Sequence, residues 1–429
     1  MKDFLNKAGR TMTTVGSKSS HFDFWIFLLF VTAISSTVFG PVCHYIGLLT
    51  ALFFVLYKSI KYNFSLTPKL TKNGKLIFII LSLFFLYSAF SYLLNYENFS
   101  SWARDSSVPL EMLAGAWLVS LLINDDKRRD IFVKTFFYIN MIAGLWIVAE
   151  QIGIAKFPSP TFSNHNMLGP YLYLAIPLNF IYIIQQKMHS FLRALYIVIN
   201  IIFVIFSFSS ITYAACFFEI FIILFFAYRA KLLDLKLIPY FCAISLGSIF
   251  LLNFFIGDKI TPLLMREMKQ ISSGDIKTLT TKRDEIWLAA LYYIKQKPFF
   301  GWGVNKFAAV HKEFLEAFAD TLKLTSKRVF VHVHNLYLMI AFEVGIPGML
   351  IFLTAMLLPI WDSFKRLFFS ANKGDVWVIA FFSMFLGQLI YSLAGEMIHH
   401  MRADVAVLLW VCWGIFSVYD KNEKTQTLA

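Results

Sequence analysis

Two histidines directly precede a long apolar run about a hundred residues before the C-terminus. His332 and His334 alternate with valines, Asn335 follows, and residues 336–360 are mostly apolar. Histidine has the ordinary pKa that lies nearest physiological pH, so it can accept a proton and return it. Beside a membrane helix, this pattern indicates acid–base chemistry at the lipid–water boundary. The alternative interpretation is an interfacial histidine that only caps a helix.

The composition identifies the class of protein. Apolar residues make up 58% of 429, charged residues 15%, and phenylalanine alone contributes 48. A soluble domain has roughly 45–50% apolar and about 25% charged residues, so the sequence predicts an all-α polytopic membrane protein. No secretory signal is expected, because residues 1–20 are polar and basic and no small-residue cleavage site follows the first apolar run. The cysteines lie in apolar segments, which favours small buried side chains over disulfides or a metal site; they are Cys43, Cys216, Cys242 and Cys412.

Runs of about 20 apolar residues are long enough to cross the hydrocarbon core of a membrane. By this measure, allowing for short runs, we expect about twelve spans. They are 24–40, 42–57, 76–95, 108–123, 131–152, 168–185, 194–209, 212–228, 237–256, 336–360, 376–394 and 403–419.

The distribution of cations orients these spans. Residues 58–75 contain five lysines and no acid, and further cations at 127–129, 187–193, 229–236 and 365–366 fall on the same side of the predicted membrane. Because short cytoplasmic loops are rich in Lys and Arg, both termini are expected in the cytoplasm. The predicted location is a bacterial inner membrane.

One predicted outer loop, residues 257–335, is far longer than the others. It holds 13 Lys and Arg against 8 Asp and Glu, and this net positive charge would attract an anionic ligand. Within it, residues 283–297 have helical periodicity, with Trp287 on the apolar face. We therefore expect a membrane bundle at 1–256, a helical periplasmic loop domain at 257–335 between the ninth and tenth spans, and further spans at 336–429.

Three stretches carry a resemblance to a known family. Arg283-x3-Trp287-x2-Ala290-x7-Pro298-x2-Gly301-x-Gly303-x3-Phe307 resembles the outer-loop signature of O-antigen ligases and related polymerases. His334-Asn335, followed by Gly345-x-x-Gly348, is similar to their His-Asn…Gly-x-x-Gly motif. Residues 161–172 resemble a third segment, which begins a span.

The resemblance implies an enzyme. Ligases of this family move a glycan from undecaprenyl diphosphate to a sugar hydroxyl of the lipid A core on the periplasmic face, without a cofactor or metal. The polymerases use the same donor to extend another lipid-linked glycan, and remain an alternative. A transporter or flippase is the alternative from a different class, although no inverted repeat is evident.

The chemistry of such a transfer assigns roles to particular residues. A base must take the proton of the acceptor hydroxyl, and cations must stabilise the departing diphosphate, which arginine binds through two parallel hydrogen bonds. The predicted catalytic residues are His334, Asn335 and His332. The predicted diphosphate-binding residues are Arg283, Arg402, Lys282 and Arg104. The predicted substrate-lining residues are Asn164, His165, Asn166 and Trp287, and no metal ligand is expected.

The chain also departs from the family pattern. The family usually has an arginine after Ser or Thr at the outer start of the eighth span, but residues 207–213 contain none. Arg402, at the outer start of the last span, is the preferred substitute. Glu219 lies within a predicted span, where a carboxyl group indicates either a proton path or a polar contact inside the helix bundle.

Overall fold

The computed structural model contains helices and no strand in the part of the chain that it describes. The described residues are 21–39, 41–96, 98–151, 165–186, 188–207, 209–272, 283–324, 328–370, 374–395 and 403–419. They form fifteen α-helices and one short 3-10 helix, η1 (Thr37–Phe39). The predicted all-helical class is therefore confirmed for these residues.

The helices follow the apolar segments of the sequence. Those before residue 240 are α2 (His21–Ser35), α3 (Pro41–Tyr62), α4 (Lys72–Asn95), α5 (Phe99–Leu122), α6 (Asp126–Gln151), α8 (His165–Gln185), α9 (Ser190–Ile205), α10 (Ser210–Arg229) and α11 (Leu237–Ser272). The later ones are α13 (Arg283–Gln296), α14 (Phe307–Phe318), α15 (Leu336–Glu343), α16 (Ile346–Phe369), α17 (Val376–Tyr391) and α19 (Ala403–Val418).

Six of the described helices are long and apolar enough to cross a membrane. They are α3, α4, α6, α8, α10 and α16, and five further helices or helical segments are apolar but shorter. These features are those of a multi-pass membrane protein. The count of twelve crossings and the direction of insertion stay predictions.

Three predicted span boundaries were wrong. α5 begins at Phe99, nine residues before the predicted start, because the Asn98 side chain accepts a hydrogen bond from the Ser101 amide and caps the helix. α11 continues to Ser272, well past the predicted end at residue 256. The predicted span 336–360 is two helices, α15 and α16, separated at Gly345, whose φ is +98°.

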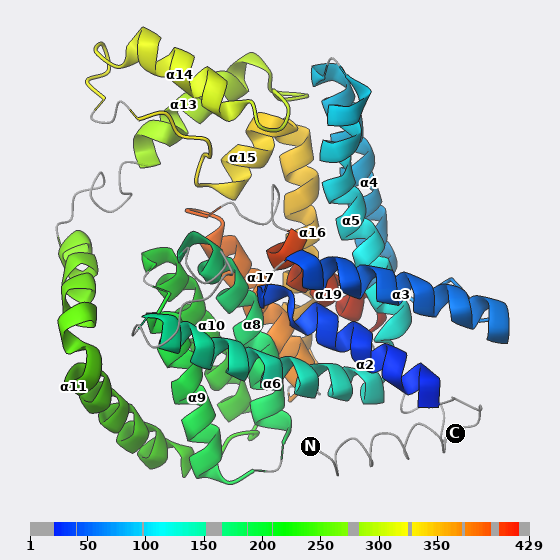
Figure 1. The fold of residues 1–429 in the computed structure, drawn as a ribbon, viewed down its shortest axis with the longest axis vertical. Helices are drawn as coiled ribbons and strands as arrows, with labels where there is room; N and C mark the ends of the chain where they lie inside the picture. Colours follow the sequence, from blue (N-terminus) through cyan, green and yellow to red (C-terminus); the bar gives the residue numbers. More distant parts are fainter. Residues whose placement is uncertain are drawn as a thin grey trace.

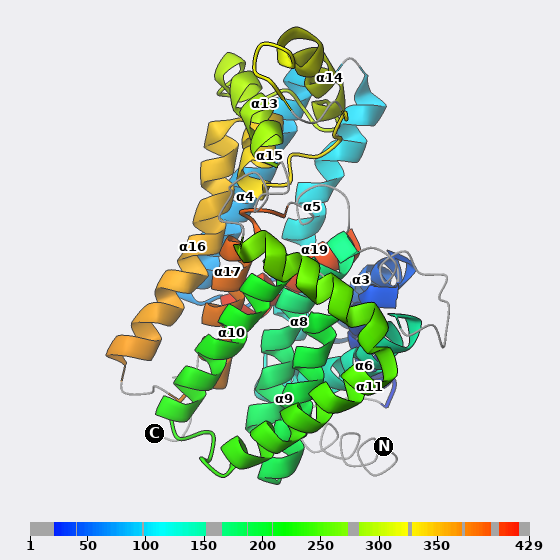
Figure 2. The same cartoon turned by 90° about the vertical axis from the view of Figure 1, so that its left-hand side faces the viewer.

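The core of the bundle lies around α8. Of the hydrophobic window Leu168–Gln185, 94% is buried, compared with 28–56% for the other five long apolar helices. A helix that is apolar on all sides is expected in the middle of a bundle. α8 contacts α6, α10 and α17, while α11 packs against α9 and wraps the outside (Figure 2). The central helix thus holds α17 in place, and α17 ends at the candidate site.

A second, smaller core joins α13, α14 and α15 at one end of the molecule (Figure 1). Its buried side chains come from both the loop helices and the histidine segment; they include Ile286, Ala290, Phe307, Phe314, Val333 and Phe342. We call the described residues 283–324 and 328–343 the α13–α15 unit. The helix predicted at 283–297 is confirmed, and α4, α5 and α16 extend from the bundle to this unit.

Candidate active site at the end of α17

His334 stands in an unusual backbone conformation directly before helix α15. Its φ is +56°, in the left-handed region that few residues other than glycine adopt. The next residue, Asn335, is the N-cap of α15: its Oδ1 accepts from the Leu338 amide at 3.0 Å. The cap therefore fixes where α15 begins, and His334 is the left-handed residue directly before it.

The carbonyl groups at the end of α17 bind the segment that carries His334. The Asn335 Nδ2 donates to the Leu393 oxygen at 3.0 Å. The Leu336 amide lies 3.0 Å from the carbonyl oxygens of both Ser392 and Gly395. These carbonyls belong to the turn that directly follows Tyr391, the last residue of α17.

Arg283, the first residue of α13, donates to the same segment. Its NH1 lies 2.9 Å from the Ala394 carbonyl oxygen. The C-terminal end of a helix carries partial negative charge, so a guanidinium group is favoured there. Two predicted site residues, Arg283 and Asn335, which are 52 positions apart in sequence, are thus brought together by one helix end.

Trp287 binds the segment that carries the two histidines. Its indole Nε1 donates to the Val333 carbonyl oxygen at 3.1 Å, so α13 holds the backbone between the two histidines. The side chain packs against the core of the α13–α15 unit. This hydrogen bond indicates a positioning role, and the predicted substrate-lining role stays a prediction.

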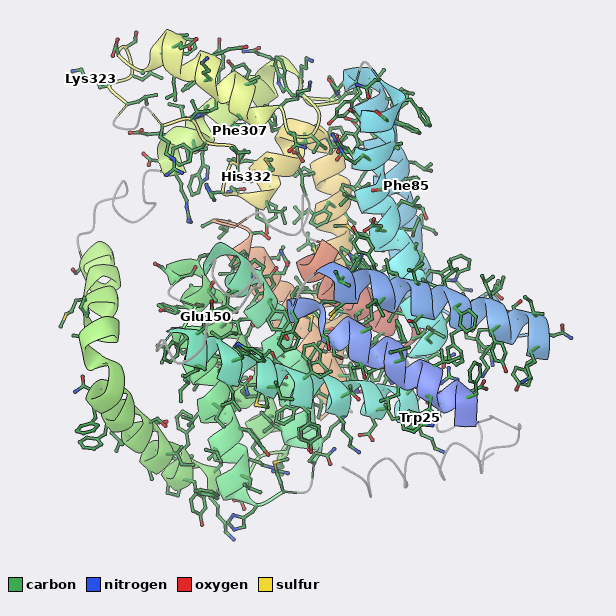
Figure 3. The ribbon with its side chains drawn as sticks, in the orientation of Figure 1. Trp25, Phe85, Glu150, Phe307, Lys323 and His332 are labelled. Atoms are coloured by element: carbon green, nitrogen blue, oxygen red, sulfur yellow. The ribbon has the colours of Figure 1, made fainter. Side chains whose placement is uncertain are left out.

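The electrostatic environment keeps His334 neutral. Burial is the largest cause that lowers the pKa of this imidazole to about 4, and the nearby Arg283 and His332 contribute to the same shift. The His332 ring lies 6.5 Å from the His334 ring, centroid to centroid. Figure 3 shows His332 on the side of the α13–α15 unit that faces the bundle. A neutral imidazole at pH 7 can act as a proton acceptor.

His311 is a structural residue that sequence reasoning did not single out. It is 3% exposed, its Nδ1 accepts from the Phe330 amide at 3.2 Å, and burial lowers its pKa. Phe330 in turn lies edge-on to His334, with ring centroids 6.4 Å apart. The periodic position of His311 in an apolar helix was the only signal available for it.

The glycines of the two motifs allow backbone to pack on backbone. A Cβ at Gly345 would overlap the Phe299 carbonyl oxygen, and one at Gly301 would lie 2.5 Å from the Glu343 carbonyl carbon. The Trp302 amide donates to the Phe342 oxygen at 2.7 Å. This turn therefore fits into the break between α15 and α16.

The same turn is anchored to α4. The Tyr87 hydroxyl donates to the Phe299 oxygen at 2.5 Å, and the Ser91 hydroxyl donates to the Phe300 oxygen at 2.6 Å. The position of α15, and with it that of His334, thus depends on a helix more than 200 residues away in sequence.

The beginning of α8 lies at the same end of the bundle. A Cβ at Gly169 would lie 3.3 Å from the ring of Tyr391, the last residue of α17. His165 and Asn166 are the first two residues of α8, so the structure brings this end of α8 near the end of α17. The predicted residues Asn164, Lys282 and Arg402 lie outside the described residues.

Arg104 is not part of this arrangement. It lies in α5, its Nε is 3.0 Å from Asp105 Oδ1, and it lines a pocket with residues of the turn after Gly303. That pocket contains neither Arg283 nor His334. Sequence reasoning expected Arg104 in an outer loop, whereas the structure places it in the first turns of α5.

A buried polar chain leads from α8 to the end of α17. The Tyr173 hydroxyl donates to Gln388 Oε1, and Gln388 Nε2 donates to the Ser392 hydroxyl at 2.7 Å. Glu219 is fully buried beside it, in the space that Gly387 leaves without a side chain. Neither carboxylate oxygen of Glu219 has a hydrogen-bond partner among the described residues, so the proton path and the polar contact both stay predictions. Sequence reasoning missed Gln388 and Ser392, whose spacing of four residues places them on one face of a helix.

Comparison with known proteins identifies a family that the chain resembles. A search of curated proteins finds no match. The family model described as O-antigen ligase matches residues 195–353, which contain Arg283, His334, Gly345 and Gly348 and exclude Arg104 and Arg402. This family consists of membrane glycosyltransferases, so the match indicates an enzyme. Residues 195–353 are thus similar to the O-antigen ligase family, and the resemblance seen in the motifs is confirmed.

Proposed function

We propose that the protein transfers a glycan from undecaprenyl diphosphate to a sugar hydroxyl of the lipid A core. The observation that carries this proposal is the convergence of Arg283 and His334 at the end of α17, within the matched domain. One residue supplies a fixed positive charge and the other a neutral base. These are the two groups that glycosyl transfer from a lipid diphosphate requires.

In the proposed reaction, His334 removes the proton of the acceptor hydroxyl as its oxygen attacks the anomeric carbon of the donor sugar. The bond between that carbon and the diphosphate oxygen breaks, and undecaprenyl diphosphate leaves with its negative charge. Arg283 binds this diphosphate, and a charge-assisted hydrogen bond contributes roughly 1.5–3 kcal/mol. No step requires a metal ion or a cofactor.

Donor binding would also improve the base. Arg283 is one cause of the low His334 pKa, and an anionic diphosphate beside it would offset that charge. The pKa of His334 would then rise toward its ordinary value, and a stronger base would be present only when the donor is bound. Premature proton transfer in the empty enzyme is thereby disfavoured.

The remaining assignments follow from this proposal. Asn335 and Trp287 position His334, while Arg402 and Lys282 stay candidates for the second cation. Residues 257–335 would form a domain on the periplasmic side of the bacterial inner membrane, with both termini in the cytoplasm.

The deciding experiment uses the purified full-length protein in lipid nanodiscs. It is supplied with an undecaprenyl diphosphate-linked glycan and with lipid A core, and the products are separated by gel electrophoresis. The proposal requires glycan-bearing lipid A core among the products. Longer lipid-linked glycan with unmodified core would identify a polymerase instead.

A further inference from the structure

A second site rich in hydrogen-bond donors lies apart from the α17 end. A pocket of about 280 Å³ opens between the α4–α5 connection and the turn that precedes α14. The connection contributes Tyr96 and Asn98, the first turns of α5 contribute Ser101 and Arg104, and the turn before α14 contributes Val304, Asn305 and Lys306. Ligand pockets have typical volumes of roughly 300–1,000 Å³, so this one is the size of a headgroup and too small for a long glycan.

Two cations face this pocket. The Arg104 side chain is 67% exposed, and only its Nε bonds to a neighbour among the described residues, Asp105. Its two terminal nitrogens therefore remain available to a ligand. Lys306 is exposed, and its Nζ lies 5.8 Å from the centroid of the Tyr96 ring, which places the ammonium group over the pocket wall.

The acid beside the pocket is shielded from it. Asp105 is 7% exposed, and its carboxylate accepts both Arg104 Nε and the Tyr96 hydroxyl. The negative charge of Asp105 is therefore stabilised by Arg104 Nε and the Tyr96 hydroxyl. Among the described residues no acid forms an ion pair with Lys306, so the pocket keeps this positive charge and the outward edge of the Arg104 guanidinium.

The helix end at the pocket adds to the positive potential. α5 has 24 residues, and Asn98 Oδ1 caps it by accepting from the Ser101 amide at 2.9 Å. The N-terminal end of a helix carries partial positive charge and favours anions. The amide of Asn305 and the hydroxyl of Ser101 can donate to oxygen atoms in the pocket as well.

Apolar side chains adjoin the pocket-lining residues in sequence. Leu93, Leu94 and Phe99 are 56%, 55% and 75% exposed, next to Tyr96 and Asn98. Exposed aromatic and aliphatic side chains beside cations are typical of a membrane interface. An acyl chain could lie along them while its headgroup enters the pocket.

From these observations we infer that the pocket binds a phosphate monoester, through Arg104, Lys306 and the N-terminal end of α5. The ligand is either an anionic lipid headgroup or a free phosphate ester. The site is separate from the diphosphate site proposed at Arg283 and does not depend on glycosyl transfer. A ligand in the pocket would also affect the position of α15. The Tyr96 hydroxyl donates to the Val304 oxygen at 2.9 Å, and the neighbouring Gly303 amide donates to the Glu343 oxygen of α15 at 3.0 Å.

Native mass spectrometry of the full-length protein in detergent tests this inference. The probes are short-chain phosphatidic acid, phosphatidylcholine of the same chain length, and inorganic phosphate. The expected result is one retained phosphatidic acid and no comparable phosphatidylcholine adduct. Arg104→Gln and Lys306→Gln should each raise the Kd for phosphatidic acid about tenfold. The control Lys312→Gln, in α14 and outside the pocket, should leave it unchanged.

Every outcome bears on the proposal. The double variant combines Arg104→Gln and Lys306→Gln. If the wild type binds both phosphatidic acid and inorganic phosphate and the double variant binds neither, the site recognises phosphate. Binding of the lipid alone assigns it to a headgroup, and binding of inorganic phosphate alone assigns it to a soluble ester. Phosphatidic acid retained equally by the double variant would overturn the proposal. Lys306→Gln breaks no ion pair among the described residues, so a folding defect in the Arg104 variant leaves the test intact.

Discussion

Arg283 and Asn335 donate hydrogen bonds to consecutive carbonyl oxygens at the end of α17, Ala394 at 2.9 Å and Leu393 at 3.0 Å. Arg283, the proposed diphosphate ligand, and Asn335, the cap of α15 that follows His334, are therefore held by the same turn at the end of α17. Any shift of the α17 end moves the proposed diphosphate ligand and the proposed base together.

Replacing His334 by glutamine should lower kcat/KM for glycan transfer by about 10²–10⁴-fold, because a general base contributes roughly that factor. His332→Gln should have a much smaller effect, since His332 is the smallest of the three causes of the lowered His334 pKa. Initial rates in nanodiscs measure both, with thermal unfolding as the check on folding. Comparable losses in the two variants would contradict the assignment of His334 as the base.

Arg283→Lys should recover little of the activity lost in Arg283→Ala. A lysine carries the charge but cannot bind the Ala394 oxygen and two diphosphate oxygens with one planar group. The KM for the lipid-linked donor is the quantity to measure, with Lys295→Ala on the same helix as control. Wild-type KM in the lysine variant would show that charge alone attracts the donor.

The pH dependence should show an acid limb near pH 4 in kcat/KM. The base works when neutral, and the pKa of His334 is lowered to about 4 in the empty enzyme, so activity is lost as the pH falls through that value. The acid limb of kcat should lie at higher pH, because bound diphosphate offsets the charge of Arg283. Identical limbs in kcat and kcat/KM would refute the coupling of donor binding to the base.

Asn335 has two bonds that substitution can separate. Asn335→Asp keeps the acceptor for the Leu338 amide but removes the donor to the Leu393 oxygen, whereas Asn335→Ala removes both. Loss of an N-cap costs about 0.5–2 kcal/mol. Thermal unfolding should therefore show the alanine variant to be less stable than the aspartate variant. Equal stability of both variants with the wild type would mean that the cap contributes nothing.

Gly345→Ala should prevent correct folding of the site. Its φ of +98° and the Phe299 oxygen beside it leave no room for a Cβ. Gly247→Ala is the matched control, because no atom lies within 4 Å of a Cβ built there. Yield and melting temperature after purification compare the two. A Gly345 variant with wild-type stability would contradict the backbone packing described for this turn.

Much of the fold followed from the sequence, because hydrophobic length and helical periodicity are local properties. Runs of apolar residues predicted most of the helices of the bundle, and the spacing within residues 283–297 predicted α13 with only one residue too many at its end. His334, Arg283 and the motif glycines stood out by residue type and spacing alone.

Tertiary structure decided how these residues meet. The acceptors for Arg283 and Asn335 are backbone carbonyls of residues 393 and 394, which have no signature in side-chain letters. Likewise, the apolar run 336–360 gives no sign that a turn near Gly301 enters it and divides it into two helices. Arg104 could be assigned to an outer loop but not to a pocket, since a pocket is formed by segments distant in sequence. Local patterns determined the helices and the reactive side chains, whereas long-range backbone contacts determined the site.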